Sequence, residues 1–97
     1  MYEILWEFLP KRGRTAEFVA AYGAEGGWAA LFRRGSGYLG TELEPVVERP
    51  GWYRTVDRWA SEQDYSRFRE RFAAEYLALD RDCERLTAEE RPAPPPA

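Results

Sequence analysis

Histidine is absent from this sequence of 97 residues, and its absence removes several kinds of chemistry. No imidazole is available as a general base, as a metal ligand or as the proximal ligand of haem. Hydrolysis by a Ser-His-Asp triad, most zinc catalysis and histidine-dependent haem chemistry are therefore excluded. Metal sites made only of carboxylates remain open, as do cofactor-free mechanisms that rely on Trp, Tyr, Arg, Asp or Thr.

Cysteine occurs once, at Cys83, which excludes an internal disulfide and a cysteine-based zinc site. Long apolar runs are missing too, and the start at Met1 lacks the basic residues and cleavage site of a signal peptide. We therefore expect a soluble protein of the cytoplasm, with no membrane partner. The formal net charge of −3 argues against nucleic acid as a partner, because binding to phosphates needs a basic surface.

The residues that are plentiful are apolar and aromatic: 44% of the chain is hydrophobic and 15% is Phe, Trp or Tyr. A chain of this length has room for one core, and such a small domain gains stability from a partner. Residue patterns predict a strand over 2–9 that Pro10 ends, and then a helix with Thr15 as its N-cap. The remaining predicted elements are a short helix over 28–33, strands over 38–47 and 52–59, and a long helix from Ser61.

The helix from Ser61 carries the clearest pattern in the chain. Ser61 and Asp64 resemble a capping box, with Asp in place of the usual Glu or Gln. The order β-α-α-β-β-α predicts an α+β domain with an antiparallel sheet and helices on one face, close to a ferredoxin-like unit. Apolar residues at helical spacing predict one buried face of the long helix: Tyr65, Phe68, Phe72, Tyr76 and Leu79, followed by Cys83 and Leu86.

The end of the chain predicts that the last strand of such a unit is weak or missing. The segment 88–91 is short, and the run Pro94–Pro96 follows it closely. Proline cannot donate to a sheet ladder and favours an extended, polyproline-like chain. We therefore expect a domain over 1–90 and a flexible, proline-rich tail over 91–97.

Several segments resemble those of the antibiotic biosynthesis monooxygenase (ABM) family: Gly27–Phe32, Gly37–Leu43, Tyr53–Ser61, Phe68 and Tyr76–Asp80. The resemblance spans residues 2–90, and its most specific part is a strand that ends in Trp and leads into a helix started by Ser. Members of this family are dimeric α+β barrels in which the sheets of two copies pack face to face. The resemblance therefore implies a homodimer, and the apolar candidates for its interface are Leu5, Leu9, Leu39, Leu43 and Val56.

The resemblance also implies an activity. The best-known catalytic members oxygenate polycyclic aromatic molecules without metal or flavin, and the substrate itself activates oxygen as a deprotonated phenol. The resemblance thus implies a monooxygenase-like protein that needs no cofactor and acts on a small aromatic or quinol-like molecule. Those members keep an Asn four residues before the Trp that matches Trp59, and Thr55 stands at that position here. A hydroxyl cannot reproduce the paired donor and acceptor of an amide, so a non-catalytic dimeric protein with a binding or structural role is the alternative.

The candidate catalytic residues are Trp59, Thr55 and Asp57, which share one face of the third predicted strand. Trp59 could line a pocket or close the core between strand and helix. Asp57 could act as a base or pair with an arginine, because an isolated buried charge is costly. No metal site is expected. The candidate substrate-binding residues are aromatic, and each could equally be ordinary core: Trp28, Tyr38, Tyr53, Tyr65 and Phe68.

Overall fold

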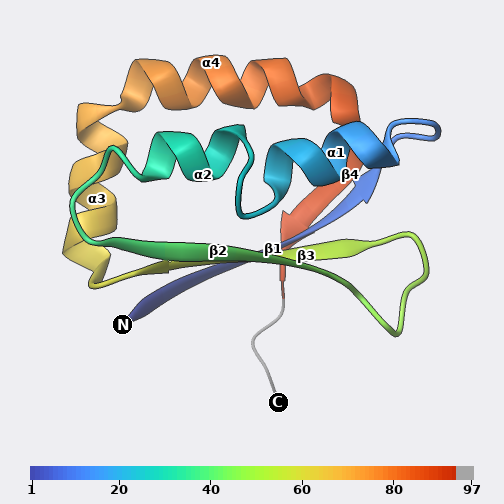
Figure 1. The fold of residues 1–97 in the computed structure, drawn as a ribbon, viewed down its shortest axis with the longest axis horizontal. Coiled ribbons are helices and arrows are strands. Elements are labelled where there is room, and N and C mark those ends of the chain that lie inside the picture. The colour runs from blue at the N-terminus through green and yellow to red at the C-terminus, as the bar shows by residue number, and fades with distance from the viewer. Residues whose placement is uncertain (94–97) are drawn as a thin grey trace.

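The fold is known from a computed structural model that describes residues 1–93. In Figure 1 a sheet lies below α1, α2 and α4, while α3 stands at one end and connects the two layers. The elements follow one another as β1 (Tyr2–Pro10), α1 (Thr15–Tyr22), α2 (Gly27–Phe32), β2 (Tyr38–Pro45), β3 (Tyr53–Trp59), α3 (Glu62–Arg71), α4 (Ala73–Cys83), a 3₁₀ turn (Glu84–Leu86) and β4 (Thr87–Pro92).

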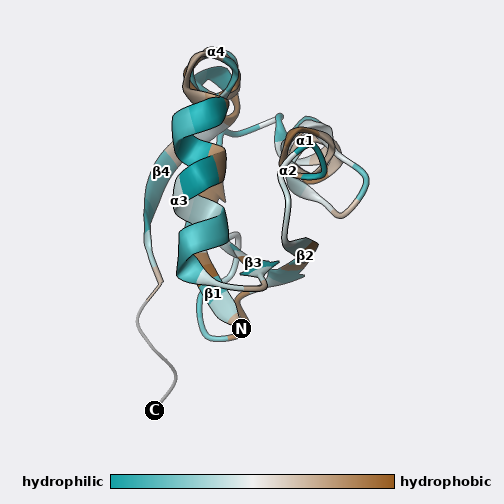
Figure 2. Cartoon of the chain, turned by 90° about the vertical axis from the view of Figure 1, so that its left-hand side faces the viewer, coloured by the Kyte–Doolittle hydropathy of each residue, from teal (hydrophilic) through white to brown (hydrophobic). Residues whose placement is uncertain are grey.

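The sheet has the strand order β2-β3-β1-β4, and every neighbouring pair is antiparallel. Seen from the end in Figure 2, the helices all lie on one side of the sheet. The same view shows that the exposed side of α3 is hydrophilic, so this helix turns its apolar side inward. The predicted fold class, an antiparallel α+β domain of ferredoxin-like type with helices on one face, is confirmed.

β4 corrects the expectation of a weak or missing last strand. Residues Thr87–Pro92 pair with β1, and the amide of Ala93 still donates to the carbonyl of Leu5 at 3.0 Å. Pro92 is tolerated because β4 lies at the edge of the sheet, where one side of the strand needs no partner. Arg91 belongs to this strand, so the tail expected over 91–97 does not begin there. Residues 94–97 lie outside the described part of the chain.

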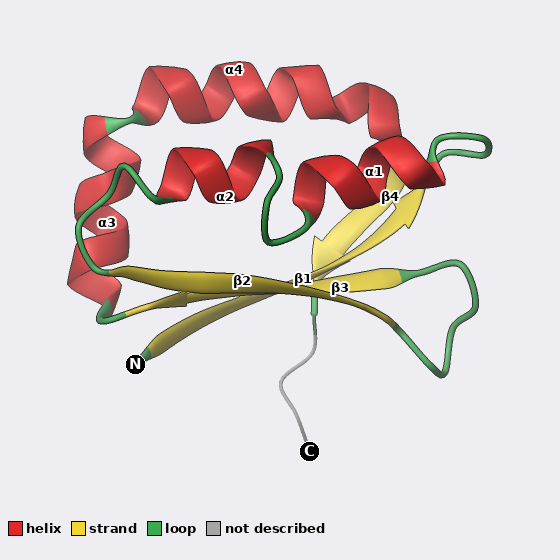
Figure 3. Cartoon of the chain, in the orientation of Figure 1, coloured by secondary structure: helices red, strands yellow, loops and turns green. Residues whose placement is uncertain are grey.

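The long helix predicted from Ser61 is broken at Phe72 into α3 and α4 (Figure 3). Ser61 caps α3, because its Oγ accepts a hydrogen bond from the amide of Asp64 at 3.1 Å. At Phe72 the backbone leaves the helical region, with φ −110° and ψ 28°, and the ring is buried in the core. Neither proline nor glycine marks this position, so the sequence carries no local signal for the bend. The bend brings α4 back across the sheet.

Alternation along the strands separates the two faces of the sheet. On β1, Ile4, Trp6 and Phe8 pack toward the helices. We call the opposite side, which no helix of residues 1–93 covers, the outer face. The interface candidates are divided by this arrangement, because Leu43 packs against the core and only Leu5, Leu9 and Val56 lie on strands with their side chains on the outer face. Leu39 lies at the β2 bulge and is 59% exposed.

Candidate functional site

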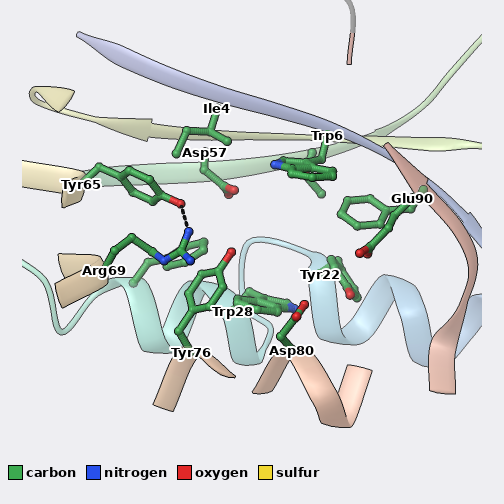
Figure 4. A pocket seen from close by; sticks show the side chains of 13 residues that line it. Ile4, Trp6, Tyr22, Trp28, Asp57, Tyr65, Arg69, Tyr76, Asp80 and Glu90 are labelled. Carbon is green, nitrogen blue, oxygen red and sulfur yellow. Dashed lines mark hydrogen bonds between the residues drawn. The ribbon is translucent and has the colours of Figure 1, made fainter. Parts of the chain in front are cut away.

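A cavity of about 300 Å³ lies between the helix-facing side of the sheet and the helices. Residues of β1 and β3 form one wall, and residues of α1 to α4 and β4 complete the lining (Figure 4). Its volume is at the lower end of the range typical of small-molecule pockets. Aromatic rings predominate in the lining, with Trp6, Phe8, Tyr22, Trp28 and Phe32 among them.

Two of the predicted catalytic residues, Thr55 and Asp57, lie side by side in this cavity on the wall formed by β3. Figure 4 shows the carboxyl group of Asp57 directed into the cavity. Thr41, on the neighbouring strand β2, donates its hydroxyl proton to Asp57 Oδ1 at 2.7 Å. Because Thr41 has a single hydroxyl proton, it must accept from the hydroxyl of Tyr38, which lies 2.6 Å away. The predicted residue Tyr38 thus contacts the site indirectly, through a hydrogen-bonded chain behind the carboxylate.

The surroundings of Asp57 change its pKa from that of an ordinary aspartate. Burial raises its pKa from 3.8 to about 6, while the hydrogen bond from Thr41 acts in the opposite direction. Within residues 1–93, Asp57 forms no ion pair with an arginine, which was the alternative role considered for it. Arg58 lies on the outer face and pairs with Glu3 and Glu42. A carboxylate with a pKa near neutrality and no neighbouring cation is suited to accept and release a proton.

Arg69, on α3, is the cation of the cavity. Its guanidinium donates to the hydroxyl of Tyr65 at 2.9 Å and lies 3.8 Å from the ring centre of Tyr76. The dashed line in Figure 4 marks the bond to Tyr65, which lines the cavity as predicted. Within residues 1–93, Arg69 forms no salt bridge with a carboxylate. Its remaining donors are therefore available to an anionic oxygen of a ligand.

The other end of the cavity is acidic. Asp80 and Glu90 line it, from α4 and β4, at a distance along the cavity from Arg69 in Figure 4. Burial, followed by the nearby carboxylates of Asp80 and Glu84, raises the pKa of Glu90 above its ordinary value. Burial also raises the pKa of Tyr76 to about 12, so this phenol stays neutral at physiological pH. The cavity thus offers a cation near α3 and hydrogen-bond acceptors near β4.

Trp59, the third predicted catalytic residue, does not line the cavity. It is fully buried, and its ring centre lies 5.1 Å from that of Phe68 and 5.8 Å from that of Phe32. A Cβ added at Gly35 would lie 2.8 Å from the Phe68 ring and 3.2 Å from the Trp59 ring, so the loop after α2 closes the junction tightly. Within residues 1–93 the indole N–H of Trp59 has no hydrogen-bond partner. Core packing is therefore the interpretation that its surroundings favour.

The predicted substrate-binding residues are divided between cavity and core. Trp28 lines the cavity together with Tyr65. Phe68 packs against Trp59 instead, and Tyr53 packs against Phe18 with ring centres 5.5 Å apart. The structure therefore brings together Thr55, Asp57, Trp28 and Tyr65.

Several residues of the cavity were not predicted from the sequence, including Trp6, Tyr22, Arg69, Asp80 and Glu90. For Arg69 a signal existed, because a residue four positions after Tyr65 lies on the same side of a helix. Glu90 had none, since the strand that carries it was expected to be weak or missing.

In residues 1–93, no group of three or more Asp, Glu or Cys side chains is placed to hold a metal ion. None of the helices in this range has the length and apolar character needed to cross a lipid bilayer.

Comparison with known proteins places the fold. SnoaB, a cofactor-independent oxygenase from Streptomyces nogalater, superposes with a TM-score of 0.70 at 18% identity, over 98% of this chain and 92% of its own. A candidate antibiotic biosynthesis monooxygenase from Bordetella bronchiseptica gives a TM-score of 0.66 at 22% identity, over 96% of each chain. A second such candidate, from Nitrosomonas europaea, gives 0.65 at 15% identity, over 96% of this chain and 94% of its own.

These similarities confirm the resemblance at the level of the fold: the chain has the ferredoxin-like α+β fold of ABM-type proteins. No family model matches the sequence, and no curated protein matches it either. At sequence identities this low, a shared fold does not imply a shared reaction, because function depends on the residues of the site.

Proposed function

We propose that this protein is a cofactor-independent monooxygenase-like enzyme that oxidises a small hydroxylated aromatic molecule in the cavity. One observation carries the proposal: Asp57 directs its carboxylate into a cavity lined by aromatic rings, with its pKa raised to about 6 and no arginine paired with it in residues 1–93. A base of this pKa can deprotonate an acidic phenol or the methylene group of an anthrone near neutral pH. The fold shared with a cofactor-independent oxygenase supports the same proposal.

The reaction balances with molecular oxygen as the only co-reactant. Asp57 accepts a proton from the substrate, and the resulting carbanion, delocalised as a phenolate, donates electrons to O₂. A C–O bond then forms at the former methylene carbon, and loss of water leaves a carbonyl group. The methylene loses four electrons, and O₂ gains four, so that one oxygen atom enters the product and the other leaves as water.

Within this proposal each lining group has a distinct task. Arg69 stabilises the phenolate oxygen, since its guanidinium has no carboxylate partner in residues 1–93. Trp28 and Trp6 hold the aromatic plane by stacking. Thr55 supplies one hydroxyl at the position where the Asn of catalytic ABM members stands.

We also propose that the chain is a homodimer whose interface is the outer face of the sheet. This face carries Leu5, Leu9 and Val56, and no helix of residues 1–93 covers it. A sheet with one uncovered face is a typical site of packing against a second layer. Light scattering tests the proposal, and a mass that stays monomeric at every protein concentration contradicts it.

Oxygen uptake tests the enzymatic proposal directly. The protein is incubated with a panel of hydroxylated anthrones in a Clark-type cell, and the carbonyl product is followed by its absorbance. We expect uptake above the uncatalysed rate, in a one-to-one ratio with product. The matched control is Asp57→Asn, which keeps the shape of the cavity but removes the base. Uptake that is equal with wild type, Asp57→Asn and no protein rules the enzyme out.

A non-catalytic binding protein is the second candidate, and two observations favour it. Thr55 replaces the amide of catalytic ABM members, and Trp59 is sealed from the cavity by packed rings. In that case aromatic ligands quench the fluorescence of the cavity tryptophans without any oxygen uptake. The two measurements, made on the same ligands, separate the candidates.

A further inference from the structure

A β-bulge at the start of β2 places two hydroxyl groups on the helix-facing side of the sheet. Tyr38 lies opposite Trp59 and Thr41 lies opposite Asp57, and the register shifts between Tyr38 and Gly40. In a regular strand, residues three positions apart point to opposite faces, so the sheet would separate Tyr38 from Thr41. The extra residue of the bulge changes this alternation, and both side chains therefore lie on the same side as Asp57. 

The residues of the bulge suit its conformation. Leu39 is the residue without a partner on β3, and it is 59% exposed. Gly40 has a φ of 153°, a backbone conformation that other residues rarely adopt. A Cβ added at Gly40 would meet no atom within 4 Å, so the backbone requires glycine here and the packing does not. Bulges next to sites are typically devices that aim a side chain, and this one aims the hydroxyl of Tyr38 at Thr41.

The two hydroxyls and the carboxylate of Asp57 form a hydrogen-bonded chain. Tyr38 Oη lies 2.6 Å from Thr41 Oγ1, which donates to Oδ1 of Asp57 at 2.7 Å. Thr41 is 8% exposed, so water has little access to the middle of the chain. The ring of Tyr38 is held between Trp59 and Phe32, with ring centres 5.4 and 5.6 Å away. Neither Tyr38 nor Thr41 lines the cavity, so the chain reaches Asp57 from behind.

This chain makes the two oxygens of the carboxylate different. Thr41 binds Oδ1, and the lone pairs of Oδ2 are left for the cavity. A hydrogen bond to a carboxylate favours its charged form, so the bond from Thr41 lowers the pKa of Asp57 while burial raises it. Without the chain, burial would act alone and the pKa would be higher still. More of the carboxyl group would then be protonated at neutral pH and unable to accept a proton.

We propose that Tyr38 and Thr41 are positioning residues of the base: their hydroxyls hold Oδ1 of Asp57, so that Oδ2 takes the proton from the substrate. This inference deepens the function proposed above and rests on it. Burial raises the pKa of Tyr38, so its phenol stays neutral and remains a donor to Thr41. The other titratable groups near Asp57 and Tyr38 lie on other segments and are unchanged in the variants below: Arg69 and Tyr65 on α3, Tyr76 and Asp80 on α4, Tyr22 on α1, Glu90 on β4, and Glu25 and Arg33 on either side of α2.

An NMR titration tests the positioning role without any substrate. The chain has four aspartates, so labelling Asp with carbon-13 at Cγ gives few signals, and Asp57→Asn identifies the signal of Asp57. Thr41→Val removes the hydroxyl but keeps the branched shape, and we expect the pKa of Asp57 to rise by about one pH unit. Tyr38→Phe should raise it by about 0.3 pH unit, because the bonds of a chain strengthen one another. Thr41→Ser keeps a hydroxyl and should have nearly the wild-type pKa.

Oxygen uptake then tests the consequence for the reaction. In Thr41→Val and Tyr38→Phe, the acid limb of the pH profile should move upward by the shift measured in the pKa of Asp57. At neutral pH kcat should fall while KM changes little, because neither residue lines the cavity. Thr87→Val, on β4 and outside the cavity lining, is the matched control and should leave the profile and the pKa unchanged. Urea unfolding shows whether each variant is folded.

The outcomes are distinct. A pKa of Asp57 that is unchanged or lower in Thr41→Val or Tyr38→Phe overturns the positioning role, and so does a pH profile that stays in place. If Thr41→Val does not fold, Tyr38→Phe carries the test, since it keeps the ring that packs against Trp59. The expected pKa shifts without oxygen uptake by any protein, wild type included, overturn the proposed enzyme, while the effect of the chain on Asp57 stands.

Discussion

Two carboxylates, the buried one of Glu7 and the half-buried one of Asp57, lie on opposite faces of the same sheet and have opposite surroundings. Glu7, on the outer face, is covered by the guanidinium groups of three arginines. Asp57, on the helix-facing side, has a threonine hydroxyl as its partner, and burial raises its pKa to about 6. Burial without a neighbouring cation raises the pKa of a carboxylate and makes it a proton acceptor near neutral pH. The partners of a buried acid therefore determine whether it serves structure or chemistry.

The largest expected effect is on activity, at Asp57. Asp57→Asn keeps the size of the side chain but cannot accept a proton from the substrate. We expect oxygen uptake to fall by roughly 100-fold or more, as is typical when a general base is lost. Ligand affinity, measured by tryptophan fluorescence, should change little. Equal oxygen uptake by the variant and the wild type would show that Asp57 is not the general base, and Asp57 would then not differ from Glu7 in having a chemical role.

Glu7→Ala tests the structural role of the other carboxylate. It leaves Arg49, Arg54 and Arg91 without their shared partner on the outer face. We expect a loss of about 3 kcal/mol in the free energy of unfolding, at the low end for a buried ion pair because the arginines are partly exposed. Urea unfolding measures the loss. Glu44→Ala, which removes an exposed carboxylate, serves as the matched control and should cost under about 0.5 kcal/mol in dilute, monomeric protein.

Asp57 should also affect stability: replacing it is expected to raise the free energy of unfolding, whereas replacing Glu7 is expected to lower it. The pKa of Asp57 in the folded state, about 6, lies above its unfolded value of 3.8. The folded state therefore holds a proton more tightly, and stability falls as the pH rises from 4 to 6. Asp57→Asn removes this cost, so we expect the variant to be more stable by about 3 kcal/mol at pH 7. Near pH 4 the two proteins should unfold alike, and a constant difference at every pH would contradict this account.

A smaller effect is expected from the glycine that closes the core on the helix-facing side. A Cβ at Gly35 would lie 2.8 Å from Phe68 and 3.2 Å from Trp59. Overpacking of this kind is expected to lower the stability of Gly35→Ala by about 1 to 2 kcal/mol. Near-ultraviolet circular dichroism should change as well, because the Trp59 ring must shift. Gly13→Ala, where the added Cβ meets no atom within 4 Å but the positive φ is strained, separates the packing effect from backbone strain.

The smallest expected effect is on ligand affinity, at Arg69. Arg69→Gln removes the cation near Tyr65 and keeps a hydrogen-bond donor. We expect affinity for a phenolate ligand to fall about tenfold, with little change for its methyl ether. Fluorescence titration with both ligands measures the difference. Equal losses for the two would assign Arg69 a packing role against Tyr76 rather than a role in charge recognition.

Local pattern was enough to predict much of this fold. Strand alternation placed Thr55 and Asp57 on one face, and Ser61 marked the start of α3 correctly. The break at Phe72 and the pairing of β4 were missed, because neither rests on a local signal: the first follows from burial of a ring and the second from contacts with β1, which is distant in sequence.

The site was predicted only in part for the same reason. Trp59 belongs to the fold's strand-to-helix junction, and sequence alone cannot tell a ring that lines a cavity from a ring that fills the core. The two carboxylates near the other end of the cavity come from α4 and β4, which meet only after the chain has folded. Arg54 and Arg58 lie on the opposite face of the sheet from the cavity, where they form ion pairs with Glu7 and Glu3.

The cluster around Glu7 also constrains how this chain reaches its fold. Its hydrogen bonds join residues separated by 42, 47 and 84 positions in the sequence. Loop closure over such distances costs entropy before any contact forms, so these bonds belong to late, non-local steps of folding. Because Glu7 precedes Arg91 by 84 positions, β1 is synthesised well before β4. The carboxylate of Glu7 therefore gains its third arginine only after β4 has been synthesised.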